Sequence, residues 1–193
     1  HKEGYKFLAI SIIATFLGLL FSKSLGIVLS VITIWVYYFF RDPERYSIQD
    51  DTFLVSPADG LITNISERTG PIELQLENIT YNKISIFMNV FNCHVNRTPL
   101  AGVVEEIYYK PGKFLNASLD KASEENERNY YKIKCNKSGE EIVVVQIAGL
   151  IARRIVCEVE QGQSLKQGER VGMIRFGSRV DVYFKNKKIL SKL

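Results

Sequence analysis

The chain has 193 residues, with 25 Lys and Arg against 21 Asp and Glu, and a formal net charge of +4. This excess of positive charge is too small to indicate a nucleic-acid-binding protein, and no basic run is interleaved with aromatic residues as a nucleic-acid groove requires. A weakly basic chain is compatible with a domain that lies close to anionic lipid.

An almost wholly apolar segment covers residues 7–40 and is interrupted only at Ser22-Lys23-Ser24. A single helix of this length would extend about 50 Å at ~1.5 Å per residue, well beyond the ~30 Å hydrocarbon core of a bilayer. We therefore expect two helices, 7–21 and 25–40, that form a hairpin with Lys23 at its tip. Each has roughly 15 residues, fewer than the ~20 usually needed to cross a bilayer. Two short spans and a hairpin that inserts without spanning both remain open.

Positive residues flank the apolar segment on both sides. Lys2 and Lys6 precede it, and Arg41 and Arg45 follow it. By the positive-inside rule, both ends then lie on the cytoplasmic side of the cell (inner) membrane. A cleaved signal peptide also begins with Lys and an apolar run, but this apolar region continues too long and contains no clear small-residue cleavage site. We therefore assign residues 1–40 to a hydrophobic, membrane-anchoring helical hairpin.

The rest of the chain, residues 41–193, is predicted to be mostly β. Short β-branched or aromatic runs separated by Gly, Pro, Asn and Ser are typical of strands, and about 150 residues are enough for one hydrophobic core. The expected fold is a compact β-sandwich or barrel-like catalytic domain that follows the N-terminal α-helical membrane hairpin. The predicted strands cover residues 61–65, 84–87, 103–109, 130–134, 142–147 and 180–184.

Two segments interrupt this strand pattern. Residues 116–129 are polar and long for a hairpin loop, which is typical either of a lid over a functional site or of a solvated surface loop. In residues 156–170 we expect turns at Gly162 and Gly168 that lead into the next strand. Such turns can also flank the lysine hairpin of a biotinyl or lipoyl carrier, but the Met-Lys-Met type of centre is absent.

The three cysteines are Cys93, Cys135 and Cys157. Their odd number and their spacing predict neither a disulfide framework nor a metal site. They favour a reducing compartment. Cys93 stands beside His94 and could be a nucleophile, but adjacent residues of a strand point to opposite faces, so we expect Cys93 to pack in the core.

A serine follows a glycine near the end of the sequence, at Gly177-Ser178. The hydroxyl lies next to the least hindered carbonyl that a peptide offers, so the backbone could cleave itself there. The histidines are His1 and His94, and His94 is the expected imidazole base. With Asp59 to orient this base, the three groups form the arrangement that makes a serine hydroxyl attack a carbonyl. Taken singly, the same residues could be a loop serine, a core histidine and a turn aspartate.

Six short motifs follow one another along the chain: Phe39-Phe40-Arg41-Asp42-Pro43, Asp59-Gly60, the segment from His94 to Pro99, Pro111-Gly112-Lys113-Phe114, Gln146-Ile147-Ala148-Gly149 and Gly177-Ser178. In this order they resemble the phosphatidylserine decarboxylase proenzymes of the short prokaryotic type, over nearly the whole chain. Members of that family cleave their own Gly-Ser bond, and the serine becomes an N-terminal pyruvoyl group that serves as the catalytic cofactor.

The resemblance implies self-processing, pyruvoyl-dependent decarboxylation of phosphatidylserine to phosphatidylethanolamine and CO2 at the membrane surface, without a metal. Ser178, His94 and Asp59 would be the catalytic residues, with cleavage between Gly177 and Ser178, and Ser178 would become the pyruvoyl group. The partners would be phosphatidylserine and membrane lipid, with no nucleic acid. The two fragments would stay together as a heterodimer, and a homodimer is a reasonable further assembly.

Three arginines are candidates for holding the phosphodiester and carboxylate of the substrate, because guanidinium groups bind such anions bidentately. Exposed charges or structural ion pairs are the alternative interpretation. These residues are Arg97, Arg153 and Arg154.

The cleavage motif departs from the commonest version in that family, which is Leu-Gly-Ser-Thr. Here Phe176 and Arg179 take the outer positions, which affects the expected shape of the pocket but not the cleavage chemistry. Two rival functions remain open. A membrane-anchored β domain that binds lipid or a partner would never modify Ser178. An anchored serine hydrolase would keep the chain intact and react with serine-directed phosphonates.

Overall fold

The computed structural model describes residues 1–50, 52–116, 122–150, 154–175 and 178–185. The chain divides into two compact units. One comprises His1–Glu44 together with Val90–Cys93, and the other comprises Arg45–Asn89 and His94–Leu193.

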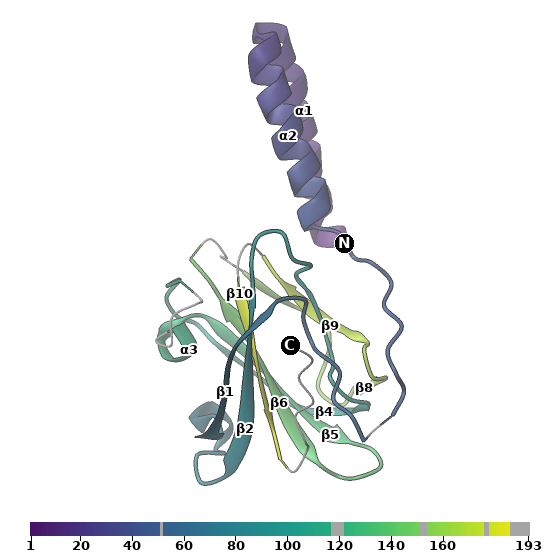
Figure 1. Cartoon of the computed structure of the whole chain (residues 1–193), viewed down its shortest axis with the longest axis vertical. Coiled ribbons are helices and arrows are strands. Elements are labelled where there is room, and N and C mark those ends of the chain that lie inside the picture. The colour runs from purple at the N-terminus through teal and green to yellow at the C-terminus, as the bar shows by residue number, and fades with distance from the viewer. Residues whose placement is uncertain (51, 117–121, 151–153, 176–177, 186–193) are drawn as a thin grey trace. The chain divides into compact units, whose positions relative to one another are not determined.

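The first unit is a helical hairpin, as the sequence predicts. After a short 3-10 turn, η1 (Lys2–Gly4), helices α1 (Tyr5–Phe21) and α2 (Lys23–Phe39) lie side by side (Figure 1). A Cβ atom at Gly26 would lie 2.1 Å from Leu19 Cδ2 and 3.1 Å from Leu19 Cα, so the helices can pack this closely only because Gly26 has no side chain. The hydroxyl groups of Thr15 and Thr33 also form a hydrogen bond of 2.9 Å between the helices.

The hairpin presents a long apolar surface. Among the residues that the structure describes, one helical stretch, Lys2–Phe21, is long and apolar enough to cross a membrane, with a mean hydropathy of 1.8. Helix α2 has 17 residues, or about 26 Å at 1.5 Å per residue. Lys23 is exposed at the junction of the helices, as predicted for the tip of the hairpin.

The second unit consists mainly of antiparallel strands, which confirms the predicted fold class. A 3-10 turn, η2 (Ile72–Leu74), and one turn of helix, α3 (Ala122–Glu125), interrupt them. The strands of the described residues are β1 (Leu61–Thr69), β2 (Thr80–Met88), β3 (Val95–Arg97), β4 (Gly102–Lys110), β5 (Arg128–Cys135), β6 (Glu141–Ala148), β7 (Ile155–Cys157), β8 (Ser164–Leu165), β9 (Arg170–Ile174) and β10 (Ser178–Phe184).

Two sheets are formed by these strands. The larger has seven strands in the order β1-β2-β10-β6-β5-β4-β8, and the smaller has three in the order β3-β9-β7. Strand β10 therefore lies in the interior of the larger sheet, between β2 and β6 (Figure 1). A strand in this position is hydrogen-bonded along both sides.

The main core lies between the two sheets. Val180, Val182 and Phe184 of β10 belong to it, together with Val171 and Ile174 of β9. Successive side chains of a strand point to opposite faces. The odd-numbered side chains of β10 therefore face the other side of the large sheet, where Leu74 and Leu76 help to cover a second apolar cluster.

All six predicted strands fall within β1, β2, β4, β5, β6 and β10. The turns expected in residues 156–170 are also present, since Gly162 and Gly168 have φ angles of 87° and 80°. The polar segment 116–129 was predicted wrongly at its end: α3 and the start of β5 lie there, and Asn126 is fully buried. Residues 117–121 of this segment lie outside the described residues.

Candidate active site

Ser178 is the first residue of β10, and its side chain is fully buried. Its Cα partners are Met88 in β2 and Ala148 in β6. Its Oγ has no hydrogen-bond partner among the described residues. A buried hydroxyl left in this state costs about 1–3 kcal/mol, and the hydroxyl of Ser85 in β2 is in the same state. Gly177, the other half of the predicted cleavage site, lies outside the described residues, as does Phe176.

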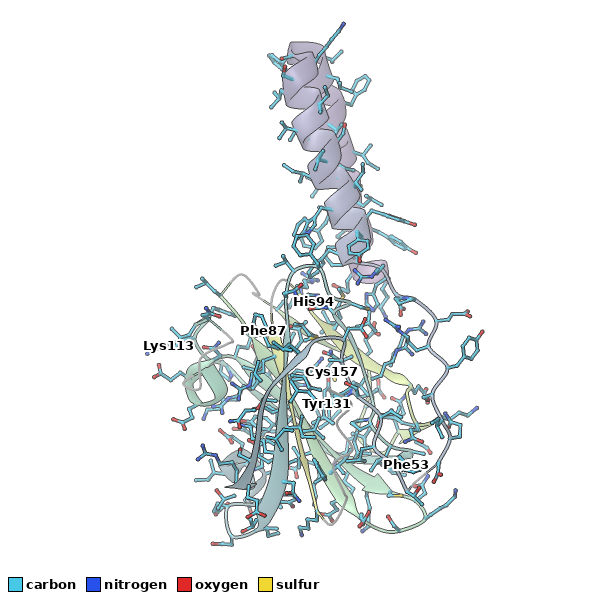
Figure 2. All side chains as sticks on the ribbon, viewed as in Figure 1. Phe53, Phe87, His94, Lys113, Tyr131 and Cys157 are labelled. Atoms are coloured by element: carbon cyan, nitrogen blue, oxygen red, sulfur yellow. The ribbon has the colours of Figure 1, made fainter. Side chains whose placement is uncertain are left out.

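His94 immediately precedes β3 and is also fully buried. Its backbone carbonyl accepts a hydrogen bond of 3.3 Å from the amide of Ile174, the last residue of β9. From Ile174 the chain continues to Ser178 in four residues. Figure 2 labels His94 near the upper end of the strand-rich unit, with Tyr131 deeper in its interior.

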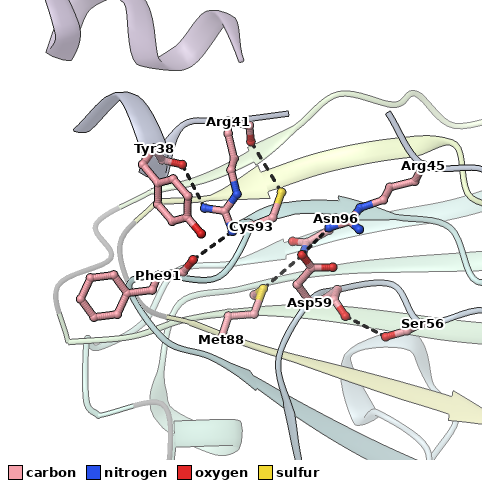
Figure 3. A network of polar contacts seen from close by, with 10 residues as sticks. Tyr38, Arg41, Arg45, Ser56, Asp59, Met88, Phe91, Cys93 and Asn96 are labelled. Atoms are coloured by element: carbon pink, nitrogen blue, oxygen red, sulfur yellow. Dashed lines mark hydrogen bonds and ion pairs between the residues drawn. The ribbon is translucent and has the colours of Figure 1, made fainter. Parts of the chain in front are cut away.

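The side chain of His94 lies on the same side of the chain as that of Asn96, if the alternation of β3 is extended by one residue. Asn96 is fully buried, and its Nδ2 lies 3.6 Å from the sulfur of Met88, the neighbour of Ser178 in β2 (Figure 3). This face of β3 is therefore directed at the large sheet where β10 begins. The fold brings His94 and Ser178 to the same end of the interior.

In a catalytic triad Asp59 would accept a hydrogen bond from His94, but in the structure it pairs with Arg45. Its Oδ2 accepts a hydrogen bond of 2.6 Å from Arg45 Nη2 (Figure 3), and the two side chains are 39% and 49% exposed. Within the described part of the chain, no hydrogen bond joins Asp59 to His94.

The loop that carries Asp59 nevertheless lies beside the site. The amide of Arg97 in β3 donates to the carbonyl of Pro57 at 2.9 Å. A Cβ atom at Gly60 would lie 2.3 Å from the carbonyl oxygen of Phe87, so the loop packs on the end of β2. The loop that carries Asp59 is thus held between β3 and Phe87 at the end of β2.

The three candidate arginines differ in their surroundings. Arg97 is half-buried, and its Nη1 donates to the carbonyl of Gly168 at 2.9 Å. Arg154 is exposed, and its carbonyl accepts a hydrogen bond of 3.2 Å from the amide of Arg175, three residues before Ser178. Arg153 lies outside the described residues.

Cys93, the alternative nucleophile, is buried in the helical unit. Its sulfur lies 3.5 Å from the carbonyl oxygen of Arg41 (Figure 3). A thiol that donates to a backbone carbonyl inside a packed unit suits a structural role.

Arg179, which departs from the common cleavage motif, points away from the site. Its guanidinium forms a two-point contact with Asp181, with Nε–Oδ1 at 2.7 Å and Nη2–Oδ2 at 3.0 Å. Lys83 Nζ lies 3.0 Å from the same carboxylate. These residues face the outer side of the large sheet.

A cavity of about 550 Å³ on that outer side is lined by both acidic and basic residues, among them Glu73, Lys83, Arg128 and Asp181. Because the side chain of Ser178 faces the opposite side of β10, this cavity does not contain Ser178.

Sequence reasoning missed two buried amides in the interior. Asn96 lies within the motif from His94 to Pro99, and Gln146 begins the motif Gln146-Ile147-Ala148-Gly149. Gln146 Nε2 donates to Asn96 Oδ1 at 2.8 Å. Their place inside two of the six motifs was the available signal.

Comparison with known proteins gives one consistent result. The profile of the phosphatidylserine decarboxylase family matches residues 32–193. The phosphatidylserine decarboxylase proenzyme of Pelagibacter ubique is 66% identical over 193 residues, which is 100% of this chain and 89% of the relative. The proenzyme of Rickettsia akari is 50% identical over 190 residues, 98% of this chain and 82% of the relative. That of Cereibacter sphaeroides is 52% identical over 183 residues, 95% of this chain and 78% of the relative.

The residues around position 178 fit the pyruvoyl group that this family uses. A pyruvoyl group forms at the amino end of a chain, and Ser178 stands at the start of a strand with its hydroxyl buried and with no partner in the described part of the chain. The six motifs, the position of Ser178 and the full-length similarity agree, and the chain belongs to the phosphatidylserine decarboxylase family.

Proposed function

We propose that this protein cleaves its own chain between Gly177 and Ser178 and then decarboxylates phosphatidylserine to phosphatidylethanolamine and CO2, with a pyruvoyl group derived from Ser178. The observation that carries the proposal is the buried Oγ of Ser178, at the start of the interior strand β10, which has no hydrogen-bond partner among the residues that the structure describes. The same end of the interior holds His94, the candidate base.

Cleavage follows from the chemistry of these groups. His94 accepts the proton of the Ser178 hydroxyl while Oγ attacks the Gly177 carbonyl carbon. The C–N bond breaks, the nitrogen of Ser178 takes up a proton, and the peptide becomes an ester. Loss of the Ser178 α-proton then breaks the Cβ–Oγ bond, and Gly177 leaves as a carboxylate. Water replaces the nitrogen of the remaining unsaturated residue, and ammonia is released.

The two fragments stay together because β10 is paired on both sides. Ser178 through Phe184 pair with β2, and Ser178 through Tyr183 pair with β6. Val180, Val182 and Phe184 are buried in the main core. The product is a heterodimer of residues 1–177 and 178–193.

The pyruvoyl group supplies an electron-withdrawing ketone that accepts the electron pair released as CO2 departs. Residue 178 is buried, which excludes bulk water from the reacting atoms. His94 gives a proton to the carbon that has lost CO2. The exposed guanidinium of Arg154, with Arg153 beside it in the sequence, binds the anionic headgroup. Arg97, whose Nη1 donates to the Gly168 carbonyl, adds positive charge to the same region.

The apolar hairpin gives the enzyme access to a lipid substrate. Residues 1–40 form the membrane anchor, and residues 41–193 form the decarboxylase domain. By the positive residues that flank the hairpin, the catalytic domain lies on the cytoplasmic side of the inner membrane.

Intact mass spectrometry of the purified protein under denaturing conditions tests this function. We expect a fragment of residues 178–193 that is lighter by one ammonia than simple hydrolysis gives, and Ser178→Ala should remain one intact chain. A wild-type chain that stays intact in the presence of phosphatidylserine vesicles, and forms no phosphatidylethanolamine, would overturn the proposal. Reaction of that intact chain with a serine-directed phosphonate would instead support the hydrolase.

A further inference from the structure

A chain of buried hydrogen bonds crosses the interior of the strand-rich unit and ends beside Ser178. The Tyr131 hydroxyl donates to Gln146 Oε1, Gln146 Nε2 donates to Asn96 Oδ1 at 2.8 Å, and Asn96 Nδ2 donates to Met88 Sδ at 3.6 Å. Figure 3 shows the last of these bonds. All four side chains are fully buried, so water does not compete for their polar groups.

The Tyr131 hydroxyl faces two acceptors, Gln146 Oε1 and the carbonyl of Val171 at 3.2 Å, so the direction of the chain is set at its other end, by the sulfur of Met88. Burial raises the pKa of Tyr131 well above its ordinary value, so its hydroxyl keeps its proton and can donate. The Gln146 carbonyl oxygen then faces Tyr131, which turns its NH2 group toward Asn96. The opposite orientation of Asn96 would set its carbonyl oxygen against the sulfur of Met88, two acceptors with no hydrogen between them.

The carboxamide of Asn96 lies across β10. Gln146 belongs to β6 and Met88 belongs to β2, and β10 is the strand between them. In the register, Gln146 is opposite Val180 and Met88 is opposite Ser178. Asn96 therefore bridges the interior face of β10 at the level of residues 178–180, which is the face that carries the Ser178 hydroxyl.

Asn96 has donor capacity that the described residues do not use. An amide NH2 group has two hydrogens. One is directed at a thioether, which is a weak acceptor, and the other has no acceptor among the described residues. On the same face of β10, Ser178 Oγ is buried and also has no partner in the described part of the structure.

We propose that Asn96 is a catalytic residue for self-cleavage, whose Nδ2 turns from the sulfur of Met88 to donate a hydrogen bond to Ser178 Oγ when negative charge develops there. The inference rests on the proposed function. Negative charge grows on this oxygen twice: when the hydroxyl loses its proton to His94, and when the Cβ–Oγ bond breaks. A buried N–H donor stabilises both transition states.

In this role Asn96 acts on an atom that the mature enzyme no longer contains. Oγ leaves with Gly177, so it is absent from the mature enzyme. The proposed hydrogen bond to Oγ therefore acts during maturation. Gln146 is a positioning residue in this scheme, because it acts only by orienting Asn96.

The test follows the loss of intact precursor by mass spectrometry after synthesis of the full chain. Asn96→Asp keeps the acceptor for Gln146 but replaces the donor with oxygen, and Asn96→Leu fills a similar volume without polar atoms. We expect cleavage to slow by about a hundredfold to a thousandfold in both. The melting temperature of each variant shows whether a loss of rate comes from unfolding. Asn82→Asp introduces the same change opposite Phe184, at the far end of β10, and should cleave at the wild-type rate.

The outcomes separate this inference from the proposed function. A wild-type chain that never cleaves overturns both. The inference alone is overturned if the wild-type chain cleaves and the folded Asn96 variants cleave at the same rate. It is also overturned if the loss of cleavage rate is no larger than the loss of folded protein. If both Asn96 variants fail to fold, Gln146→Leu is the second variant: it frees the Asn96 carboxamide to rotate. Slowed cleavage by folded Gln146→Leu supports the inference, and the wild-type rate overturns it.

Discussion

The backbone amide of Ile174 and the backbone carbonyl of His94 share a hydrogen bond of 3.3 Å. Ile174 ends β9, and four residues later Ser178 begins β10 opposite Met88. The proposed base is thus fixed by its backbone at the point where the chain leaves one sheet for the other. Substitution of the His94 side chain leaves this bond in place, so the chemistry of the imidazole can be tested without removing the connection.

His94→Gln should slow self-cleavage by about a hundredfold to ten-thousandfold, the usual range for loss of a general base. Glutamine occupies a comparable volume, and the backbone bond to Ile174 does not depend on the side chain. The rate is measured as the loss of intact precursor, and the melting temperature identifies any unfolded protein. Cleavage by the folded variant at the wild-type rate would remove His94 from the mechanism.

The pairing of Asp59 with Arg45 allows the predicted role of Asp59 to be tested. An exposed ion pair contributes only about 0.2–1 kcal/mol, so Asp59→Asn and Arg45→Gln should each change stability by less than about 1 kcal/mol. If Asp59 orients the base during cleavage, Asp59→Asn should slow cleavage at least tenfold, whereas Arg45→Gln should not. Equal, small effects in both variants would reduce Asp59 to a structural partner of Arg45.

Arg179 and Asp181 should matter for stability, not for cleavage, although Arg179 follows the cleavage serine. Both side chains are buried, and Asp181 is the counter-ion of both Arg179 and Lys83. Asp181→Asn leaves two buried cations with reduced compensation and should destabilise the protein by about 3–5 kcal/mol. The measurement is denaturant unfolding, with Arg179→Met as the comparison because it removes one buried charge together with its demand for a counter-ion. A slower cleavage rate in folded Asp181→Asn would contradict the separation of the two faces.

Sequence patterns predicted the fold to the extent that its elements are long. The six predicted strands have enough alternation or β-branched character to be recognised, and the hairpin follows from an apolar segment too long for one helix. Strands β3, β7 and β8 have two or three residues each, too few to show a period. The central position of β10 depends on pairing with strands that are distant in the sequence, which no local pattern reveals.

The residues of the candidate site could be predicted from the sequence only in part. Ser178 and His94 could be selected because their chemistry is distinctive, and the structure brings them to one end of the interior. The partner of Asp59 could not be selected, because Arg45 precedes it by 14 residues in a segment without a periodic pattern. Asn96 and Gln146 carry no charge and no nucleophile, so they become candidates only once the fold directs them at β10.

Glu73 should make stability depend on pH below the ordinary carboxyl range. Burial opposes its ionisation, but the hydrogen bond from Lys110 and the charge of Arg128 outweigh burial, so the pKa of Glu73 lies below its model-compound value of 4.5. Glu73 Oε1 is 2.8 Å from Lys110 Nζ and 3.4 Å from the guanidinium of the buried Arg128. Because the folded chain holds the ionised form more strongly than the unfolded chain does, this contribution is complete above about pH 5 and decreases as the pH falls through the folded-state pKa.

Glu73→Gln should therefore lower the free energy of unfolding by about 2–3 kcal/mol near neutral pH, since Arg128 loses a buried counter-ion. The difference between wild type and variant should shrink as the pH falls below 4.5. Denaturant unfolding at a series of pH values measures this difference, and Glu77→Gln, which removes an exposed carboxylate from the same segment, is the matched control. A difference that stays constant down to pH 3 would show that Glu73 stabilises the fold through packing instead of through its charge.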